Sequence, residues 1–132
     1  MNTQIILSVS RHTLAGTMAF PEVVACLLEA GVESYHVDYV ARRTTFYGTD
    51  GDVASTAIDF EHLPPIAADF CPDSVRAAIR DSQLNGQTYR DFTHRVMEAG
   101  VQGYFAFLRG KRVTYWGRQG DQHTEWFPDA TT

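Results

Sequence analysis

The sequence predicts an α+β fold in which helices pack on an antiparallel or mixed sheet, built from two copies of a helix–helix–three-strand unit. Three observations predict this fold. Residues 29–52 align with residues 98–121 without a gap, at an offset of 69, and 10 of the 24 aligned positions are identical. Each copy changes from helical to alternating hydrophobic spacing, as expected where strands follow helices. Gly31 and Gly100 stand at the same boundary in the two copies.

The first copy spans about residues 3–58. A first helix around residues 5–14 ends at Gly16, and a second carries apolar residues at i, i+3, i+4, i+7 and i+8 from Phe20, the spacing of one helix face. Gly31 suits the left-handed position that follows a helix. Alternation then predicts three strands, arranged as strand 35–40, turn 42–43, strand 44–47, turn 48–51 and a short last strand.

The second copy, about residues 72–128, repeats this plan. Pro72 opens a helix that closes near Gly86. Thr88 and Asp91 have the spacing of a capping pair for the next helix, which ends at Gly100. The alternating segments predict strands at residues 103–109, 113–116 and 122–127.

The whole chain, residues 1–132, is expected to form one domain. Residues 59–71 contain Pro64-Pro65 and no clear period, so we interpret them as a connector between the copies. A three-stranded unit with one apolar face needs a partner surface. We therefore expect the two copies to share one core.

Composition and charge exclude several classes of function. The net charge of −5 argues against nucleic-acid binding, which depends on a positive field. The two cysteines have no metal-ligand spacing and no glycine-rich phosphate loop is present, so no cofactor is predicted. The N-terminus lacks the features of an export signal, and no stretch approaches the roughly 20 apolar residues of a membrane span. We expect a cytoplasmic protein without a membrane segment.

Two polar pairs break the repeat. Each copy has one strand with a histidine and an acid on the same face, where the other copy has apolar or small residues. His36 and Asp38 correspond to Phe105 and Phe107, and His123 and Glu125 correspond to Ala54 and Thr56. If the two strands meet, the four side chains are candidates for binding a divalent metal or for acid–base catalysis. Otherwise they are solvated polar faces or local hydrogen-bonded pairs.

Basic and aromatic side chains supply the candidates for ligand binding. Six basic residues lie at or beside the predicted hairpin turns: Arg42, Arg43, Arg109, Lys111, Arg112 and Arg118. A shared patch would suit a phosphate or an acidic partner, although charged turns in solvent are the simpler interpretation. Adjacent aromatic residues such as Tyr115 and Trp116 must point to opposite faces of a strand. Unless both faces of the sheet are covered, one of each pair therefore belongs to an exposed surface, a ligand pocket or a dimer interface. We take Arg42, Arg43, Arg112, Arg118 and Trp116 as the ligand-binding candidates.

Seven short segments together resemble one bacterial family. The segments are residues 20–24, 29–32, 35–38, 103–105, 110–113, 115–118 and 123–125. The chain resembles the YdfO-like uncharacterised family, which is associated with prophages and whose members are sometimes labelled phage envelope proteins. The resemblance implies an α+β fold of unknown function and supplies no active site.

Two hypotheses of function follow. The first is a small cytoplasmic protein that acts through a surface for a protein partner or for a second copy of itself. The alternative is a small enzyme or a metal- or ligand-binding protein that uses His36, Asp38, His123 and Glu125. Whether the protein is an enzyme is left open.

Overall fold

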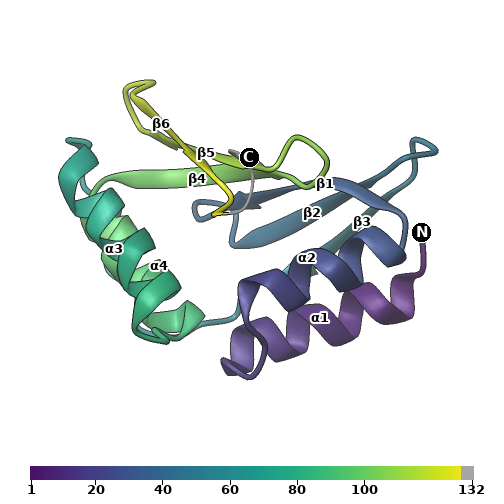
Figure 1. Cartoon of the computed structure of the whole chain (residues 1–132). Coiled ribbons are helices and arrows are strands. Elements are labelled where there is room, and N and C mark those ends of the chain that lie inside the picture. The colour runs from purple at the N-terminus through teal and green to yellow at the C-terminus, as the bar shows by residue number, and fades with distance from the viewer. Residues whose placement is uncertain (129–132) are drawn as a thin grey trace.

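The computed structural model describes residues 1–128, which form four helices and one six-stranded antiparallel sheet (Figure 1). The first copy comprises α1 (Thr3–Ala15), α2 (Phe20–Glu29), β1 (Val32–Asp38), β2 (Arg43–Gly48) and β3 (Val53–Ala57). The second comprises α3 (Pro72–Leu84), α4 (Tyr89–Glu98), β4 (Val101–Phe107), β5 (Arg112–Gly117) and β6 (Gln122–Trp126). The predicted α+β class and the two helix–helix–three-strand units are confirmed, and the sheet is antiparallel rather than mixed.

The sheet joins the two copies through their first strands. Its order is β3-β2-β1-β4-β5-β6, so each copy supplies one half of the sheet. His36 of β1 lies directly opposite Phe105 of β4, and these two residues are also repeat equivalents. A local twofold axis between the copies therefore passes between His36 and Phe105.

Caps and glycines fix the helix ends, and the sequence predicts those at Thr88, Gly31 and Gly100 but not the cap at Asn2. The Asn2 side chain accepts hydrogen bonds from the backbone N–H groups of residues 4 and 5 and begins α1. Thr88 Oγ1 accepts from Asp91 N at 3.2 Å and begins α4. Gly31 and Gly100 have φ of 91° and 97°, a conformation that glycine adopts without the steric cost of a Cβ.

The first strand of each copy begins and ends earlier than the alternation predicts. In the first copy, Asp38 Oδ1 accepts hydrogen bonds from Val40 N at 2.9 Å and Ala41 N at 3.0 Å, which closes a turn directly after β1. Arg42 completes this turn with φ of 58°. Arg43, predicted to lie in the turn, is instead the first residue of β2.

The helices all lie on one side of the sheet, and the core is between them and that face (Figure 1). The strand positions that face the helices are buried and apolar, as at Tyr35, Val37, Phe46, Tyr104, Ala106, Val113 and Tyr115. The alternate positions point away from the helices. Within residues 1–128 no helix packs on that second face, which we call the open face.

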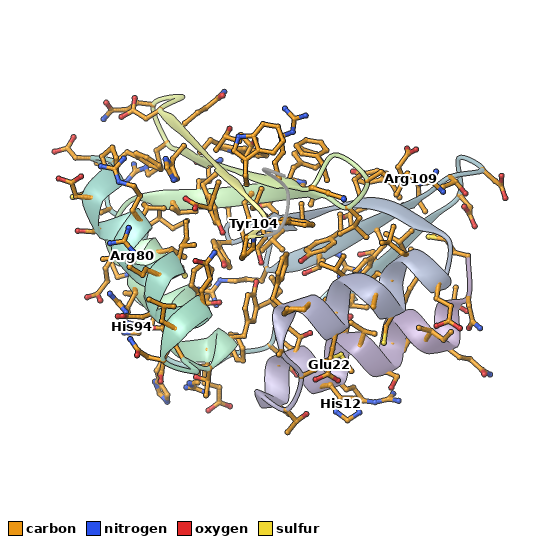
Figure 2. All side chains as sticks on the ribbon, in the orientation of Figure 1. His12, Glu22, Arg80, His94, Tyr104 and Arg109 are labelled. Carbon is orange, nitrogen blue, oxygen red and sulfur yellow. The ribbon has the colours of Figure 1, made fainter. Side chains whose placement is uncertain are left out.

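Tyrosine hydroxyls form the polar part of the core. The hydroxyls of Tyr89 and Tyr104 lie 2.8 Å apart, and the hydroxyl of Tyr39 lies 3.4 Å from that of Tyr89 and 3.5 Å from Thr93 Oγ1. Figure 2 labels Tyr104 in this region between the sheet and the helices. Burial raises the pKa of Tyr39 and Tyr104 well above the usual value of 10, so these hydroxyls stay protonated.

The helices of residues 1–128 are not membrane spans. None of them is both long enough and apolar enough to cross a bilayer.

Candidate functional site

The open face consists of three rows of side chains that run across all six strands. The apolar row, read from β3 to β6, is Val53, Tyr47, Ser34, Phe107, Arg112 and Trp126. The central row is Ser55, Thr45, His36, Phe105, Thr114 and Thr124. The polar row is Ala57, Arg43, Asp38, Gly103, Trp116 and Gln122. The local twofold axis exchanges the apolar and polar rows.

A stack of rings occupies the middle of the open face. The His36 ring lies 4.6 Å from the Phe105 ring and 5.3 Å from the Trp116 ring, stacked on both. The Phe105 ring also stacks on Phe107 at 5.6 Å. These side chains are partly shielded by one another, which lowers the apolar area that the face exposes to water.

Gly103 allows the strands to pack closely at this stack. It lies opposite Trp116, and a Cβ at residue 103 would be 2.5 Å from the backbone oxygen of Val37 and 3.6 Å from His36 Nε2. A contact of 2.5 Å is shorter than atoms tolerate. Glycine is therefore required beneath the His36 and Trp116 rings.

His36 has an altered protonation equilibrium. Burial against the rings lowers the pKa of His36 below its usual value of 6.5, and the smaller effect of the Asp38 charge opposes this shift. The imidazole is therefore predominantly neutral at pH 7. A neutral ring stacks on its aromatic neighbours without the cost of burying a charge.

The apolar row contains the exposed hydrophobic side chains of the open face. Val53 is 59% exposed, Phe107 is 37% exposed and Trp126 is 45% exposed. The Arg112 guanidinium lies between the last two along the row, 4.1 Å from the centre of the Trp126 ring. The repeat equivalents of the three exposed residues, in the polar row, are Gln122, Asp38 and Ala57. On the open face, the large apolar side chains that are exposed therefore all lie on one side of the local twofold axis.

A shallow hollow adjoins the apolar row. Its volume is about 580 Å³, and it is lined by Glu33, Ser34, Phe107, Arg109, Gly110, Arg112, Thr114 and Thr124. Arg109, labelled in Figure 2, comes from the turn between β4 and β5. Two arginines and one glutamate give this hollow a positive balance, unlike the chain as a whole.

Five of the nine residues predicted from the sequence lie on the open face: His36, Asp38, Arg43, Arg112 and Trp116. Arg43 donates to Ser55 Oγ from Nη2 at 2.6 Å. Arg42 lies in the turn after β1, and the Arg118 guanidinium donates to the backbone oxygen of Ile66 at 3.2 Å. Asp38 at the end of β1 pairs with Gly103 near the start of β4, so the turn after β1 and the turn after β4 lie at opposite ends of the sheet. The basic turns therefore do not form one patch.

His123 and Glu125 lie on the opposite face of the sheet from His36. They pair with Tyr115 and Val113, whose side chains face the helices. His123 Nε2 lies 3.0 Å from Glu125 Oε1. Since β4 and β5 separate β1 from β6, the two His-x-acid pairs are also about 14 Å apart across the sheet at the usual strand spacing. The structure does not bring the four residues together, and no cluster of three or more metal-ligating side chains occurs within residues 1–128.

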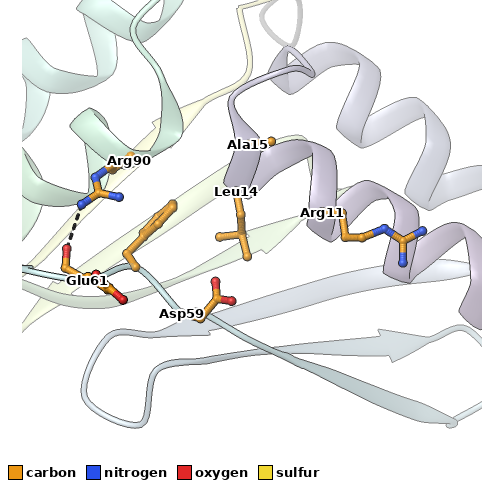
Figure 3. A pocket seen from close by; sticks show the side chains of 7 residues that line it. Arg11, Leu14, Ala15, Asp59, Glu61 and Arg90 are labelled. Atoms are coloured by element: carbon orange, nitrogen blue, oxygen red, sulfur yellow. Dashed lines mark hydrogen bonds between the residues drawn. The ribbon is translucent and has the colours of Figure 1, made fainter.

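A second hollow lies at the C-terminal end of α1 (Figure 3). Arg11, Leu14, Ala15, Asp59, Phe60, Glu61 and Arg90 line it. Arg90 donates to the backbone oxygen of Glu61 at 2.9 Å and lies 5.6 Å above the Phe60 ring. Two arginines and two acids balance one another here, so this hollow has no charge preference for a ligand.

The model of one known protein family matches most of the chain. Residues 16–125 match the model of a family described as protein of unknown function (DUF1398). The chain belongs to this family. No curated protein matches the sequence. The YdfO-like and prophage associations of this DUF1398 protein remain predictions, because the family description contains neither.

Sequence reasoning missed three residues of this DUF1398 protein's open face, Val53, Phe107 and Trp126. The signal was nevertheless present, since each has a small or polar repeat equivalent. The comparison that singled out the two histidine pairs, applied to large apolar residues, would have identified the apolar row.

Proposed function

We propose that this DUF1398 protein is a binding module, and that its apolar row binds an acidic protein segment with large apolar side chains. The observation that carries the proposal is that the exposed Phe107 and Trp126 flank Arg112 in one row. The row continues through Ser34 and Tyr47 to the exposed Val53 at the other edge of the sheet. Contiguous exposed apolar surface on a soluble protein commonly marks an interaction site.

The residue types of the row suit an interface. Tryptophan and arginine are the side chains that most often dominate binding energy. Trp126 and Arg112 are already in contact, at 4.1 Å, so the pair is ordered before a partner arrives. Less side-chain entropy is then lost on binding.

The charge of the site favours an acidic partner. The chain has a net charge of −5, yet the hollow beside Phe107 contains Arg109 and Arg112 against Glu33 alone. A carboxylate at this hollow would meet two guanidinium groups, which bind carboxylates with directional hydrogen bonds. A basic partner would be repelled here.

The alternative function, a His and carboxylate catalytic or metal site, has less support. His36 and His123 face opposite sides of the sheet, and Asp38 Oδ1 is occupied by the turn after β1.

Selection of short random peptides displayed on phage tests the proposal. Panning against the immobilised full chain is expected to enrich peptides that combine acidic residues with Leu, Ile, Phe or Trp. Synthetic versions should bind the free protein, and Trp126→Ala should weaken the binding at least tenfold, because the variant loses the largest exposed ring of the row.

Val40→Ala is the matched control, since Val40 is 65% exposed but lies in the turn after β1. This variant should bind the peptides as the wild type does. Enrichment of basic peptides, or equal binding by Trp126→Ala, would contradict the proposal.

A further inference from the structure

The two edge strands, β3 and β6, are repeat equivalents, and each has one side without a partner strand in residues 1–128. On β3, Asp52 O accepts from Gly48 N and Ile58 N donates to Arg42 O, both at 2.8 Å. Hydrogen-bonded pairs alternate along an antiparallel ladder. The N–H and C=O groups of residues 53, 55 and 57 therefore point outward from the sheet.

The edge at β6 carries features that discourage pairing with another chain. Glu125 points toward the helix side of the sheet and contacts His123 at 3.0 Å. Pro128 follows the strand closely and lacks a backbone N–H. Inward-pointing charges and prolines are devices by which natural sheets protect their edges.

The edge at β3 has none of these features within the described residues. Its sequence, Val-Ala-Ser-Thr-Ala, contains no charge and no proline. No side chain of the strand is larger than valine, and Val53, Ser55 and Ala57 are all exposed. Such an edge is a template for a further strand.

Helix α1 lies next to this unprotected edge, on the helix side of the sheet. Ser10 Oγ lies 3.2 Å from Thr56 Oγ1, so α1 packs beneath β3. Leu7 lies on the same helix about 60° around the axis from Ser10, at 100° per residue. Its direction is away from the buried Ile6 and Val9, and it is 48% exposed.

We infer that β3 pairs antiparallel with β3 of a second copy, continuing the sheet across two protomers. A twofold axis through Ser55 places Ser55 opposite Ser55 and Val53 opposite Ala57 of the second copy. These small side chains oppose no like charges within the pairs. The same axis brings the two α1 helices next to each other, where Leu7 supplies apolar contact.

The pairing has a predictable dependence on salt. Arg43 Nη2 donates to Ser55 Oγ at 2.6 Å, so the guanidinium groups of the two copies flank the axis. Salt screens their repulsion and should strengthen the pairing.

Sedimentation equilibrium of the full chain tests the inference. The wild type is expected to sediment with twice the chain mass at about 100 µM. Ser55→Pro removes an outward N–H but no backbone hydrogen bond to β2, and proline is tolerated at such edge positions. It also removes the side-chain bond from Arg43, just as a proline at Thr124 removes the contact with Thr114. It should raise the dimer dissociation constant at least tenfold. Thr124→Pro, the equivalent change on β6, should leave the dimer intact.

Circular dichroism establishes that each variant folds. If Ser55→Pro does not fold, Ser55→Lys with Thr124→Lys as its control replaces it, because lysines opposite each other across the axis repel. Leu7→Ser should weaken the dimer and Leu84→Ser, at an exposed residue of α3, should not. A monomeric wild type overturns the inference. Equal dissociation constants for the β3 and β6 variants would also overturn it.

Discussion

At the scale of single residues, the two copies meet at a position where their sequences differ. His36 and Phe105 are repeat equivalents and direct cross-strand neighbours, with rings 4.6 Å apart. Two phenylalanines would suit the same stack. The histidine makes the packing of the open face depend on protonation.

This dependence gives a prediction for stability against pH. The pKa of His36 in the folded protein lies below 6.5 because of burial, whereas the unfolded chain binds the proton near 6.5. As pH falls through 6.5, the unfolded state takes up the proton first, so the free energy of unfolding decreases.

Replacing His36 by the residue of its equivalent isolates this effect. Urea unfolding of the wild type should show a steeper loss of stability between pH 7 and pH 5 than unfolding of His36→Phe, because the other histidines are common to both proteins. Parallel curves for the two proteins would show that burial of His36 has no such consequence.

Gly103 gives a second prediction at this scale. Gly103→Ala places a Cβ 2.5 Å from the oxygen of Val37, so the strands must separate. We expect a loss of about 1–3 kcal/mol in unfolding free energy, the usual cost of overpacking. Ser34→Ala, at the equivalent position, should change stability by less than about 0.5 kcal/mol. Equal effects in urea titrations would contradict this explanation of the glycine.

At the scale of elements, most helices and strands follow from the sequence because their signals are local. The repeat, the cap at Thr88 and the glycines after α2 and α4 predict the order of the elements. Strand ends were less predictable, since the end of β1 depends on hydrogen bonds from the Asp38 side chain.

The orientation of β6 could not be predicted from its hydrophobicity. Alternation shows that His123 and Glu125 share one face, with Trp126 on the other. The apolar residue would be expected to face the core, but the register with β5 turns Trp126 to the open face and the polar pair toward the helices. Because β6 is an edge strand, the polar side chains at the sheet margin retain access to water.

The two edge strands show that equivalent elements of the two copies have diverged in sequence. β3 and β6 occupy equivalent places, but inward charge and a nearby proline protect β6 alone. The different effects expected for Ser55→Pro and Thr124→Pro on dimer mass are a direct measure of this divergence.

At the scale of the whole molecule, duplication produces a sheet with a local twofold axis. Substitutions after duplication make the open face apolar on one side of that axis. The apolar row crosses all six strands, so each copy contributes to it: Val53, Tyr47 and Ser34 from the first, and Phe107, Arg112 and Trp126 from the second. Neither copy alone presents the complete row. The proposed binding surface therefore depends on both halves of the fold.

Phe107→Asp is the sharpest test of the apolar row as the binding surface, because it replaces Phe107 by the residue of its repeat equivalent, Asp38. The measurement is the dissociation constant of a selected acidic peptide by isothermal titration calorimetry, with Gln122→Ala in the polar row as the control.

Phe107→Asp should weaken binding at least tenfold, about 1.4 kcal/mol, through loss of apolar contact and repulsion of the acidic peptide. Gln122→Ala should bind as the wild type does, and both variants should unfold cooperatively. An unchanged dissociation constant for a folded Phe107→Asp protein would contradict the proposed role of the apolar row.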